Sequence, residues 1–382
     1  MKLPSNNSLQ HSLFKDIEKA NHPLGKIRDG QSPAAGNRTK GFTDRNITLA
    51  HGSGGKAMRD LIEDIFISTF NNQTLSHLED QASFDLASLT QHGDKLAFTT
   101  DSYVVDPLFF PGGNIGELAV NGTVNDLAVG GAKPLYLTCS VILEEGFSID
   151  TLRSIAKSMQ STAQKANIQI VTGDTKVVHR GAADKLFINT AGIGVISHEV
   201  CISTDNIKPG DAVIVNGELG NHGAAILIAR GELALESDIT SDTQPLNSLV
   251  DTILQVCPQI HAMRDTTRGG LATVLNEFAI ASNFGIRLYE ESLPIREEVK
   301  GVCEILGLDP LYLANEGKLV LTVPQAKAEI VLEIMRSHEA GKNAQIIGEV
   351  VDFSLPIVSL QTTFGTERII DMLVGEQLPR IC

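Results

Sequence analysis

Residues 99–137 read "TTDSYVVDPLFFPGGNIGELAVNGTVNDLAVGGAKPLYL". They begin inside an apolar, β-like run that starts at residue 96, and apolar side chains recur at helical spacing from residue 114 to 129. We expect Asp101 where the strand gives way to a turn and Asp126 on the helix. Because strands and helices of this kind alternate along the chain, the sequence predicts an α/β (α+β) fold.

The helix at 114–129 also carries a polar row. Asn114 and Glu117 are spaced as an N-terminal capping pair, and Glu117, Asn121 and Asn125 lie four residues apart on one face. Such a row meets a ligand, a metal or a subunit partner, or it is a solvated face. The pattern leaves both readings open.

Length and charge limit the function. A chain of 382 residues is expected to form about two domains. Its formal net charge of −15 argues against nucleic-acid and anionic-membrane surfaces, and the 5% aromatic content with no Trp argues against base stacking. We therefore expect neither a nucleic acid nor a membrane as partner.

The cysteines indicate a reducing compartment. Cys139, Cys201, Cys257, Cys303 and Cys382 are odd in number and lack CxxC spacing, so neither a disulfide framework nor a zinc site is expected. The N-terminus lacks the apolar core of a signal peptide, and no apolar stretch is long enough for a membrane span. These features predict a cytoplasmic protein.

Four segments follow from composition and periodicity. Residues 1–46 have eight Lys and Arg against four Asp and Glu and are expected to be a mobile basic extension. The first ordered domain covers 47–204, a second α/β domain covers 205–354, and 355–382 form a C-terminal segment and flexible tail that carries Cys382.

Two further carboxylates follow strand-like runs. Asp174 lies in "VTGDTKVV" and Asp265 in "MRDTTRGG". Together with Asp101 and Asp126 they match the needs of a Mg²⁺–phosphate site, since Mg²⁺ is held by one or two carboxylates plus phosphate oxygens. The alternative is that each Asp caps a turn or a helix.

The stretch "MRDTTRGGLATVLNEFA" (263–279) is the densest in polar groups. Thr266 and Arg268 crowd a helix start, where backbone donors favour phosphate. Glu277 follows among apolar residues and is a candidate general base, or else an exposed helix residue. Lys133, in "GGAKPLYL", is a second proton-transfer candidate, or it lies at a turn.

The glycine turn "HGSGGK" (51–56) does not fit the P-loop pattern. Its glycines precede a helix, so its backbone N–H groups suit an anion, although an ordinary helix-start turn explains the pattern equally well.

The sequence closes on "EQLPRIC" (376–382). From Met372 onward an extended chain spans roughly 35 Å, so the Cys382 thiol lies on a tether that can visit several places. Without further information, a cysteine placed there by chance is the alternative.

These stretches together resemble the HypE family of [NiFe]-hydrogenase maturation factors. "HGSGGKAM", the segment at 99–137, "VTGDTKVV", "MRDTTRGGLATVLNE", "LANEGK" and "PRIC" occur in the order of that family. The resemblance covers 47–382 and leaves residues 1–46 outside.

The resemblance implies two mixed-sheet domains of the aminoimidazole ribonucleotide synthetase and selenophosphate synthetase type, a homodimer formed through the first domain, and ATP between the domains. It also implies a reaction. A HypF-type carbamoyltransferase would load Cys382 with a carbamoyl group, ATP would drive its dehydration to a thiocyanate, and the cyano group would pass to iron on a HypC–HypD complex.

The same resemblance implies roles for individual residues. Asp101, Asp126 and Asp265 would bind Mg²⁺, and Cys382 would be the catalytic carrier, with Lys133 and Glu277 assisting proton removal. The residues implied to bind ATP are Asp101, Asn125, Asp174, Thr266, Arg268 and, in a phosphate-covering flap, His51, Gly52, Gly54 and Gly55.

Two rivals remain. A sibling synthetase such as selenophosphate synthetase is expected to keep a reactive Cys in its glycine loop, and "HGSGGKA" has none. A non-enzymatic scaffold for hydrogenase assembly would turn over no ATP.

Overall fold

The computed structural model describes residues 44–76, 78, 81–231, 237–375 and 378–382. The predicted basic extension therefore lies, apart from residues 44–46, outside the described residues. Helical segments before the first sheet are η2 Leu49–Gly52, α2 Lys56–Leu61, the π-helical η3 Ile62–Ile67, α3 Ser68–Phe70, α4 Gln73–Ser76 and α5 Leu86–Leu89.

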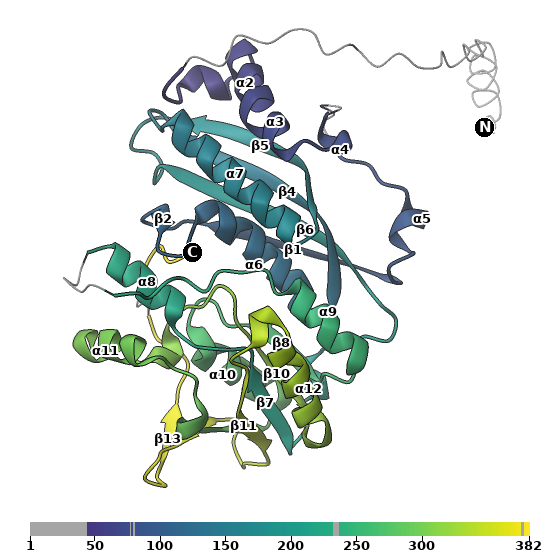
Figure 1. Cartoon of the computed structure of the whole chain (residues 1–382), viewed down its shortest axis with the longest axis vertical. Helices are drawn as coiled ribbons and strands as arrows, with labels where there is room; N and C mark the ends of the chain where they lie inside the picture. The colour runs from purple at the N-terminus through teal and green to yellow at the C-terminus, as the bar shows by residue number, and fades with distance from the viewer. Residues whose placement is uncertain (1–43, 77, 79–80, 232–236, 376–377) are drawn as a thin grey trace, which may run out of the picture. The chain divides into compact units, whose positions relative to one another are not determined.

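A four-stranded sheet forms the first half of the described chain. Its order is β1 (Lys95–Tyr103), β6 (Leu186–Ile196), β4 (Ala132–Glu144) and β5 (Gln169–Val178), antiparallel except between β4 and β5. Helices α6 (Ile115–Val129) and α7 (Ile149–Lys165) cover one face (Figure 1).

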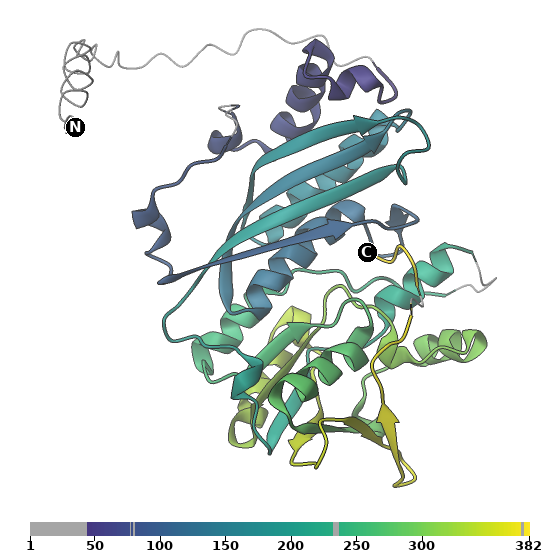
Figure 2. The ribbon, with the colours of Figure 1, turned by 180° about the vertical axis from the view of Figure 1, so that it is seen from behind.

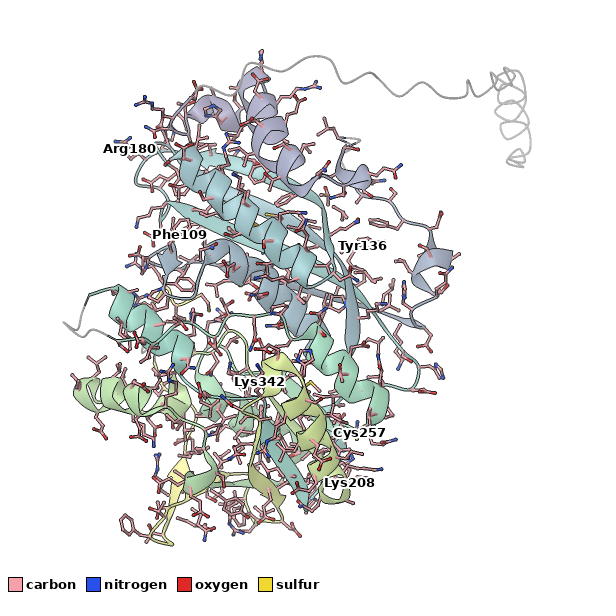
Figure 3. All side chains as sticks on the ribbon, viewed as in Figure 1. Phe109, Tyr136, Arg180, Lys208, Cys257 and Lys342 are labelled. Atoms are coloured by element: carbon pink, nitrogen blue, oxygen red, sulfur yellow. The ribbon has the colours of Figure 1, made fainter. Side chains whose placement is uncertain are left out.

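Figure 2 shows the other face of this sheet, over which no helix of the described residues lies. Apolar side chains remain exposed there: Phe98 is 69% exposed and Leu96 47%. Tyr136 of β4, labelled in Figure 3, stacks on Phe84 with ring centroids 3.9 Å apart. An uncovered sheet face with large apolar groups is suited to a partner surface.

Helix α6 lies between the two sheets (Figure 1) and is buried along almost its whole length. Asn114 caps it as predicted: its side chain accepts from the Gly116 N–H at 2.9 Å and donates to the Glu117 carboxylate at 3.0 Å. The helix packs on the first sheet and on α9 (Asn247–Val256), and this burial fixes the position of Asp126.

The second sheet has seven strands in the described residues, in the order β13, β12, β9, β11, β7, β10, β8. All pairs are antiparallel except β9–β12. Its elements are β7 Asp211–Val215, β8 Ala262–Asp265, β9 Gly285–Tyr289, β10 Leu319–Pro324, β11 Gln345–Val351, β12 Val358–Gln361, β13 Glu367–Ile370, α8 Asn221–Ala229, α10 Gly270–Ser282, α11 Glu297–Leu306 and α12 Gln325–Ser337.

The remaining short elements are the hairpin β2 Phe109–Phe110 and β3 Gly113–Asn114, and the 3-10 turns η4 Thr204–Asn206, η5 Glu290–Ser292, η6 Pro310–Tyr312 and η7 Glu339–Gly341. The first sheet ends at Ile196 and the second begins at Asp211. A domain boundary near residue 205 stays a prediction. Among the described helices, none combines the length and the apolar character that crossing a membrane requires.

Two sequence-based placements are corrected. Asp101 and Asp174 do not follow their strands but lie within β1 and β5, because the β-branched residues around them extend the pairing. Lys133 does not lie at a turn: it belongs to β4, a strand of which only the apolar run after Lys133 was noted from the sequence.

Candidate active site

The last residues of the chain are docked between the two sheets. Figures 1 and 2 place the C-terminus beside the β2–β3 hairpin and near α8. Ile381 is 6% exposed and belongs to the core of the first sheet, and Leu378 packs against the same core. The predicted flexible tail therefore has a defined resting position over residues 378–382, which we call the tail.

Arg230 and His222 hold the tail by its main chain. The Arg230 guanidinium donates to the carbonyls of Pro379 at 2.6 Å and Arg380 at 2.8 Å. His222, fully buried, lies with Nε2 2.9 Å from the Ile381 carbonyl and Nδ1 2.8 Å from the Ser241 hydroxyl. Since a carbonyl can only accept, Nε2 carries the proton and Nδ1 accepts.

This docking puts the Cys382 thiol against Glu316. The thiol lies close enough to the Glu316 carboxyl for the two groups to shift each other's pKa. Burial, and then the nearby carboxylate charge of Glu316, raise the pKa of Cys382 well above its usual value. The thiol is therefore protonated at rest and is not an activated nucleophile.

Glu316 is a buried carboxyl with a raised affinity for a proton. It is 3% exposed, and burial, followed by the charges of Asp242 and Asp265, raises its pKa well above the usual range. Its Oε1 atom has no hydrogen-bond partner among the described residues. A buried carboxyl with one unpartnered oxygen beside a substrate-bearing atom suits general acid–base work.

A buried ion pair between Lys318 and Asp242 holds the backbone at Glu316. Lys318 Nζ lies 3.0 Å from Asp242 Oδ2, and Asp242 Oδ1 accepts the Glu316 N–H at 3.1 Å. Burial favours the neutral form of Asp242, but Lys318, His222 and the Glu316 N–H together outweigh it and lower the pKa of Asp242. The backbone that carries Glu316 is thereby fixed in place.

The structure brings three predicted carboxylates together, and we call Asp101, Asp126 and Asp265 the acidic cluster. Burial raises the pKa of Asp126 to about 6, opposed by a 2.9 Å hydrogen bond from Thr99, and the charge of Asp101 adds to the rise. Burial and then the charge of Asp126 raise the pKa of Asp265 to about 7. Burial and like charge therefore both favour the protonated forms of these carboxyls.

Arg268 links this cluster to the tail. Its guanidinium lies 3.7 Å from Asp101 and lowers the pKa of Cys382 slightly against the larger effects of burial and Glu316. The predicted residues Asp101, Arg268 and Cys382 thus meet at one place, next to Glu316.

A cavity of about 610 Å³ opens beside the cluster. Asp126 and Asp265 line it together with Thr99, Arg264, Met263 and Phe278. Its size is in the range of small-molecule sites. In the described part of the chain no three His, Cys, Asp or Glu side chains converge closely enough to enclose a metal, so a cation here would need ligands from a bound molecule.

The glycine loop and Asp174 lie elsewhere in this chain. The loop from His51 to Gly55 packs on β5, with Gly52 against Val177, and Asp174 lies on β5 itself. Strands β5 and β1 are the opposite edges of the first sheet, so these residues are not beside Asp101. His51 is buried, accepts from the Thr48 N–H at 2.9 Å and lies 3.3 Å from Asp44. Gly54 and Gly55 are exposed.

Lys133 and Glu277 are not brought to the thiol. Glu277 is exposed on α10, where Leu275 and Phe278 form the buried face, and it pairs with Arg264. Lys133 is exposed and lines a separate cavity with Lys165 and Asn247. Among the described residues, the partner of Glu277 is Arg264, and neither Glu277 nor Lys133 affects the pKa of Cys382. The apolar neighbours of Glu277 mark a helix face that points away from it.

The polar row of α6 has a third role that was not foreseen. Asn125 accepts from the Leu246 N–H at 2.7 Å and donates to the Gln244 carbonyl at 3.1 Å, and Asn121 donates to Thr243 at 3.1 Å. The row therefore joins α6 to the segment before α9 and is neither solvated nor open to ATP in this structure. Thr266 is likewise fully buried behind Asp265.

Sequence reasoning missed Glu316, Asp242, His222 and Arg230. Only Glu316 carried a signal, because "LANEGK" (313–318) had been noted as a motif without a role. His222 and Arg230 lie at the two ends of α8 and Asp242 lies in an irregular segment, and their functions depend on where the tail docks.

Comparison with known proteins places this geometry in a family. Two family models match: AIR synthase related protein, N-terminal domain, over residues 78–196, and AIR synthase related protein, C-terminal domain, over 208–358. The Carbamoyl dehydratase HypE of Rhodobacter capsulatus is 55% identical over 339 residues, which are 89% of this chain and 99% of that protein.

Similar solved structures indicate the same family. A hydrogenase maturation protein HypE in complex with ATP is 47% identical, with a TM-score of 0.83 over 87% of this chain and 99% of that one. A chain from a HypE–HypF complex is 48% identical, with a TM-score of 0.71 over 82% and 99%. The two-domain fold of the AIR synthase type expected from the sequence is confirmed, and the chain belongs to the HypE family.

Proposed function

We propose that this protein dehydrates an S-carbamoyl group on its own Cys382 to a thiocyanate at the expense of ATP, and so supplies the cyanide ligand for the iron of [NiFe]-hydrogenase. The observation that carries the proposal is the docked Cys382 thiol, which lies beside Glu316 and next to the acidic cluster. The free thiol stands where the sulfur of the carbamoylated cysteine would be.

The reaction needs a leaving group and a base. Transfer of the terminal phosphoryl group of ATP to the carbamoyl oxygen makes that oxygen part of a phosphate, and one N–H proton leaves. Loss of the second proton and cleavage of the C–O bond then form the C≡N bond, so the products are the thiocyanate, ADP and phosphate. We assign Glu316 as the base that takes a proton from the carbamoyl nitrogen, in the place foreseen for Glu277.

ATP fits the cavity beside Asp126 and Asp265 by its volume and by the donors at its edge. A relative of 47% identity was solved with ATP. Arg268 is placed to stabilise charge on the transferring phosphoryl group. Asp174 and the loop from His51 to Gly55 would reach the nucleotide only by a movement or from a second copy.

The acidic cluster fits Mg²⁺. Burial, and then the charge of a neighbouring carboxylate, raise the pKa values of Asp126 and Asp265, and a cation would offset both effects. One or two carboxylates plus phosphate oxygens are the usual set for this metal. Asp126 and Asp265 would hold it, with Asp101 nearby, and the metal would neutralise phosphate charge.

The proposed reaction requires partner proteins that load the carbamoyl group and accept the cyano group. The tail must visit a HypF-type carbamoyltransferase, and a relative was solved in a HypE–HypF complex. A HypC–HypD complex is the proposed cyano acceptor. The uncovered face of the first sheet, with Leu96, Phe98 and Ile142 exposed, supports a homodimer, which analytical ultracentrifugation would test.

Intact-mass analysis tests the function. After incubation with the carbamoyltransferase, carbamoyl phosphate and ATP, we expect Cys382 to gain about 43 Da, a carbamoyl group, and then to lose about 18 Da, one water, only when this protein can use ATP. Cys382→Ala should show neither change. A stable carbamoyl adduct with no ATP turnover would favour the assembly scaffold instead.

A further inference from the structure

We propose that the surface that holds residues 378–382 is a peptide-binding groove that recognises mainly main-chain carbonyls, and that it accepts a separate peptide ending in Leu-Pro-Arg-Ile-Cys as well as the chain's own tail. We call the surface formed by Asp106, His222 and Arg230 the tail groove. Binding rests on the contacts of the groove, and only the fate of the bound thiol rests on the proposed function.

Arg230 is the centre of the tail groove. Its Nη2 donates to two carbonyls of the tail, and its Nε donates to the Asp106 carbonyl at 2.9 Å. The Asp106 N–H in turn donates to the Arg380 carbonyl at 3.3 Å. One guanidinium therefore ties the wall of the groove and the peptide together, with a charged donor in each bond to a carbonyl.

His222 binds the next main-chain carbonyl of the tail, that of Ile381. It is fully buried, and its ring lies edge-on to Phe110. Because the Ile381 carbonyl can only accept, Nε2–H donates to it and Nδ1 accepts from the Ser241 hydroxyl. Three successive tail carbonyls, from residues 379 to 381, are thus all paired with the groove.

Fewer contacts of the tail with the groove are made by tail side chains than by its main chain. Ile381 and Leu378 enter apolar clusters, whereas the Arg380 side chain makes only an exposed ion pair with Asp184 at 3.1 Å. The groove therefore requires apolar groups at the positions of Leu378 and Ile381 and tolerates change at Arg380.

The docked tail also differs in burial from residues 371–375, which precede it. Residues 371–375 before it are largely exposed, and Val374 is 93% exposed. The tail is held by its own contacts rather than by the preceding segment, as a tethered ligand is. The tether supplies an effective concentration of about the millimolar order, which sets the amount of free peptide needed to compete.

Alkylation of the full chain with iodoacetamide, followed by peptide mass spectrometry, tests this. Cys382 is the reporter and the exposed Cys201 is the internal reference. The buried Cys139, Cys303 and Cys257, the last of which lies at the end of α9 (Figure 3), report whether the fold is intact.

Arg230→Gln should raise alkylation of Cys382 about tenfold relative to Cys201, because the charged donors to the tail are lost. The matched variant Arg380→Ala, which loses only an exposed ion pair, should change it by about threefold or less. Cys382 that stays protected in Arg230→Gln, with the buried cysteines unreactive, overturns the role of the groove.

A competition experiment between a free peptide and the tail tests the proposal with the unaltered protein. The peptide acetyl-Leu-Pro-Arg-Ile-Ser, at about millimolar concentration, should raise Cys382 alkylation to a plateau. The same peptide with Asp in place of Ile should not. If neither peptide changes Cys382, or both do equally, the groove does not bind peptides as proposed. No ATP or carbamoyl group is present, so this result is independent of the dehydration.

Discussion

The acidic cluster and the tail groove meet at Cys382, but their polar groups are satisfied in opposite ways. In the tail groove, Arg230 and His222 have partners in the chain itself. In the acidic cluster, Asp126 and Asp265 repel one another, and their pKa values rise to about 6 and about 7. The tail satisfies the polar groups of the groove, whereas burial and like charge in the cluster favour binding of a cation.

This difference separates two kinds of ligand. A site whose hydrogen-bonding groups are all paired with its occupant favours that occupant over water, and in the tail groove the occupant is the tail. A site with stored repulsion favours a cation and the phosphates that come with it. Glu316 lies where the two meet, and the following changes test how the cluster, the tail and Glu316 contribute to the reaction.

The largest effect is expected from Glu316→Gln. Loss of the base should slow thiocyanate formation by about 10²–10⁴-fold, while the carbamoyl adduct on Cys382 still forms. Single-turnover mass spectrometry of the carbamoylated protein measures this. Glu277→Gln, which changes an exposed helix carboxyl, is the matched control and should stay within about twofold of the unaltered protein.

Asp265→Asn should act mainly on the acidic cluster, and it also removes a charge that raises the pKa of Glu316. Mg²⁺-dependent ATP binding should weaken by about tenfold or more, since a cation loses one charged ligand. The unliganded protein should gain about 1 kcal/mol in its free energy of unfolding, because one repelling charge is gone. Calorimetric titration and denaturant unfolding measure the two. Asp174→Asn, exposed on β5, should change the free energy of unfolding by about 0.5 kcal/mol or less.

The pH dependence follows from the same pKa values. Both carboxyls titrate above their unfolded values, so their contribution to stability is lost as the pH rises through about 6 and about 7. Mg²⁺ must displace those protons, and its apparent affinity should fall roughly tenfold from about pH 8 to about pH 6. Proton release on Mg²⁺–ATP binding, compared in two buffers, would show this. Equal affinity at both pH values would contradict the repulsion in the cluster.

Lys133→Ala should give the smallest effect. The side chain is exposed and lines a cavity away from the tail, so dehydration should change by about twofold or less. A loss as large as that of Glu316→Gln would show that a second copy or a movement brings Lys133 to the thiol.

Sequence patterns predicted the acidic cluster better than the tail groove for a physical reason. The 3.6-residue period of α6 placed Asp126 on a helix, and the strand before the turn placed Asp265 at its end. Glu316 lies in an irregular segment between η6 and β10, where no period predicts which side chains are buried. Asp101 was placed at a strand end because its neighbours resemble turn residues, yet pairing with Thr190 extends the strand past it.

The fate of the carbamoyl oxygen tests the central claim most directly. With Cys382 carbamoylated from carbamoyl phosphate labelled with oxygen-18 in its carbonyl, one ATP-dependent turnover should place the label in inorganic phosphate, because ATP phosphorylates that oxygen before it leaves. Mass spectrometry of the released phosphate reads the result. Label that appears in water, with unlabelled phosphate, would contradict ATP-driven dehydration of the tail in this site.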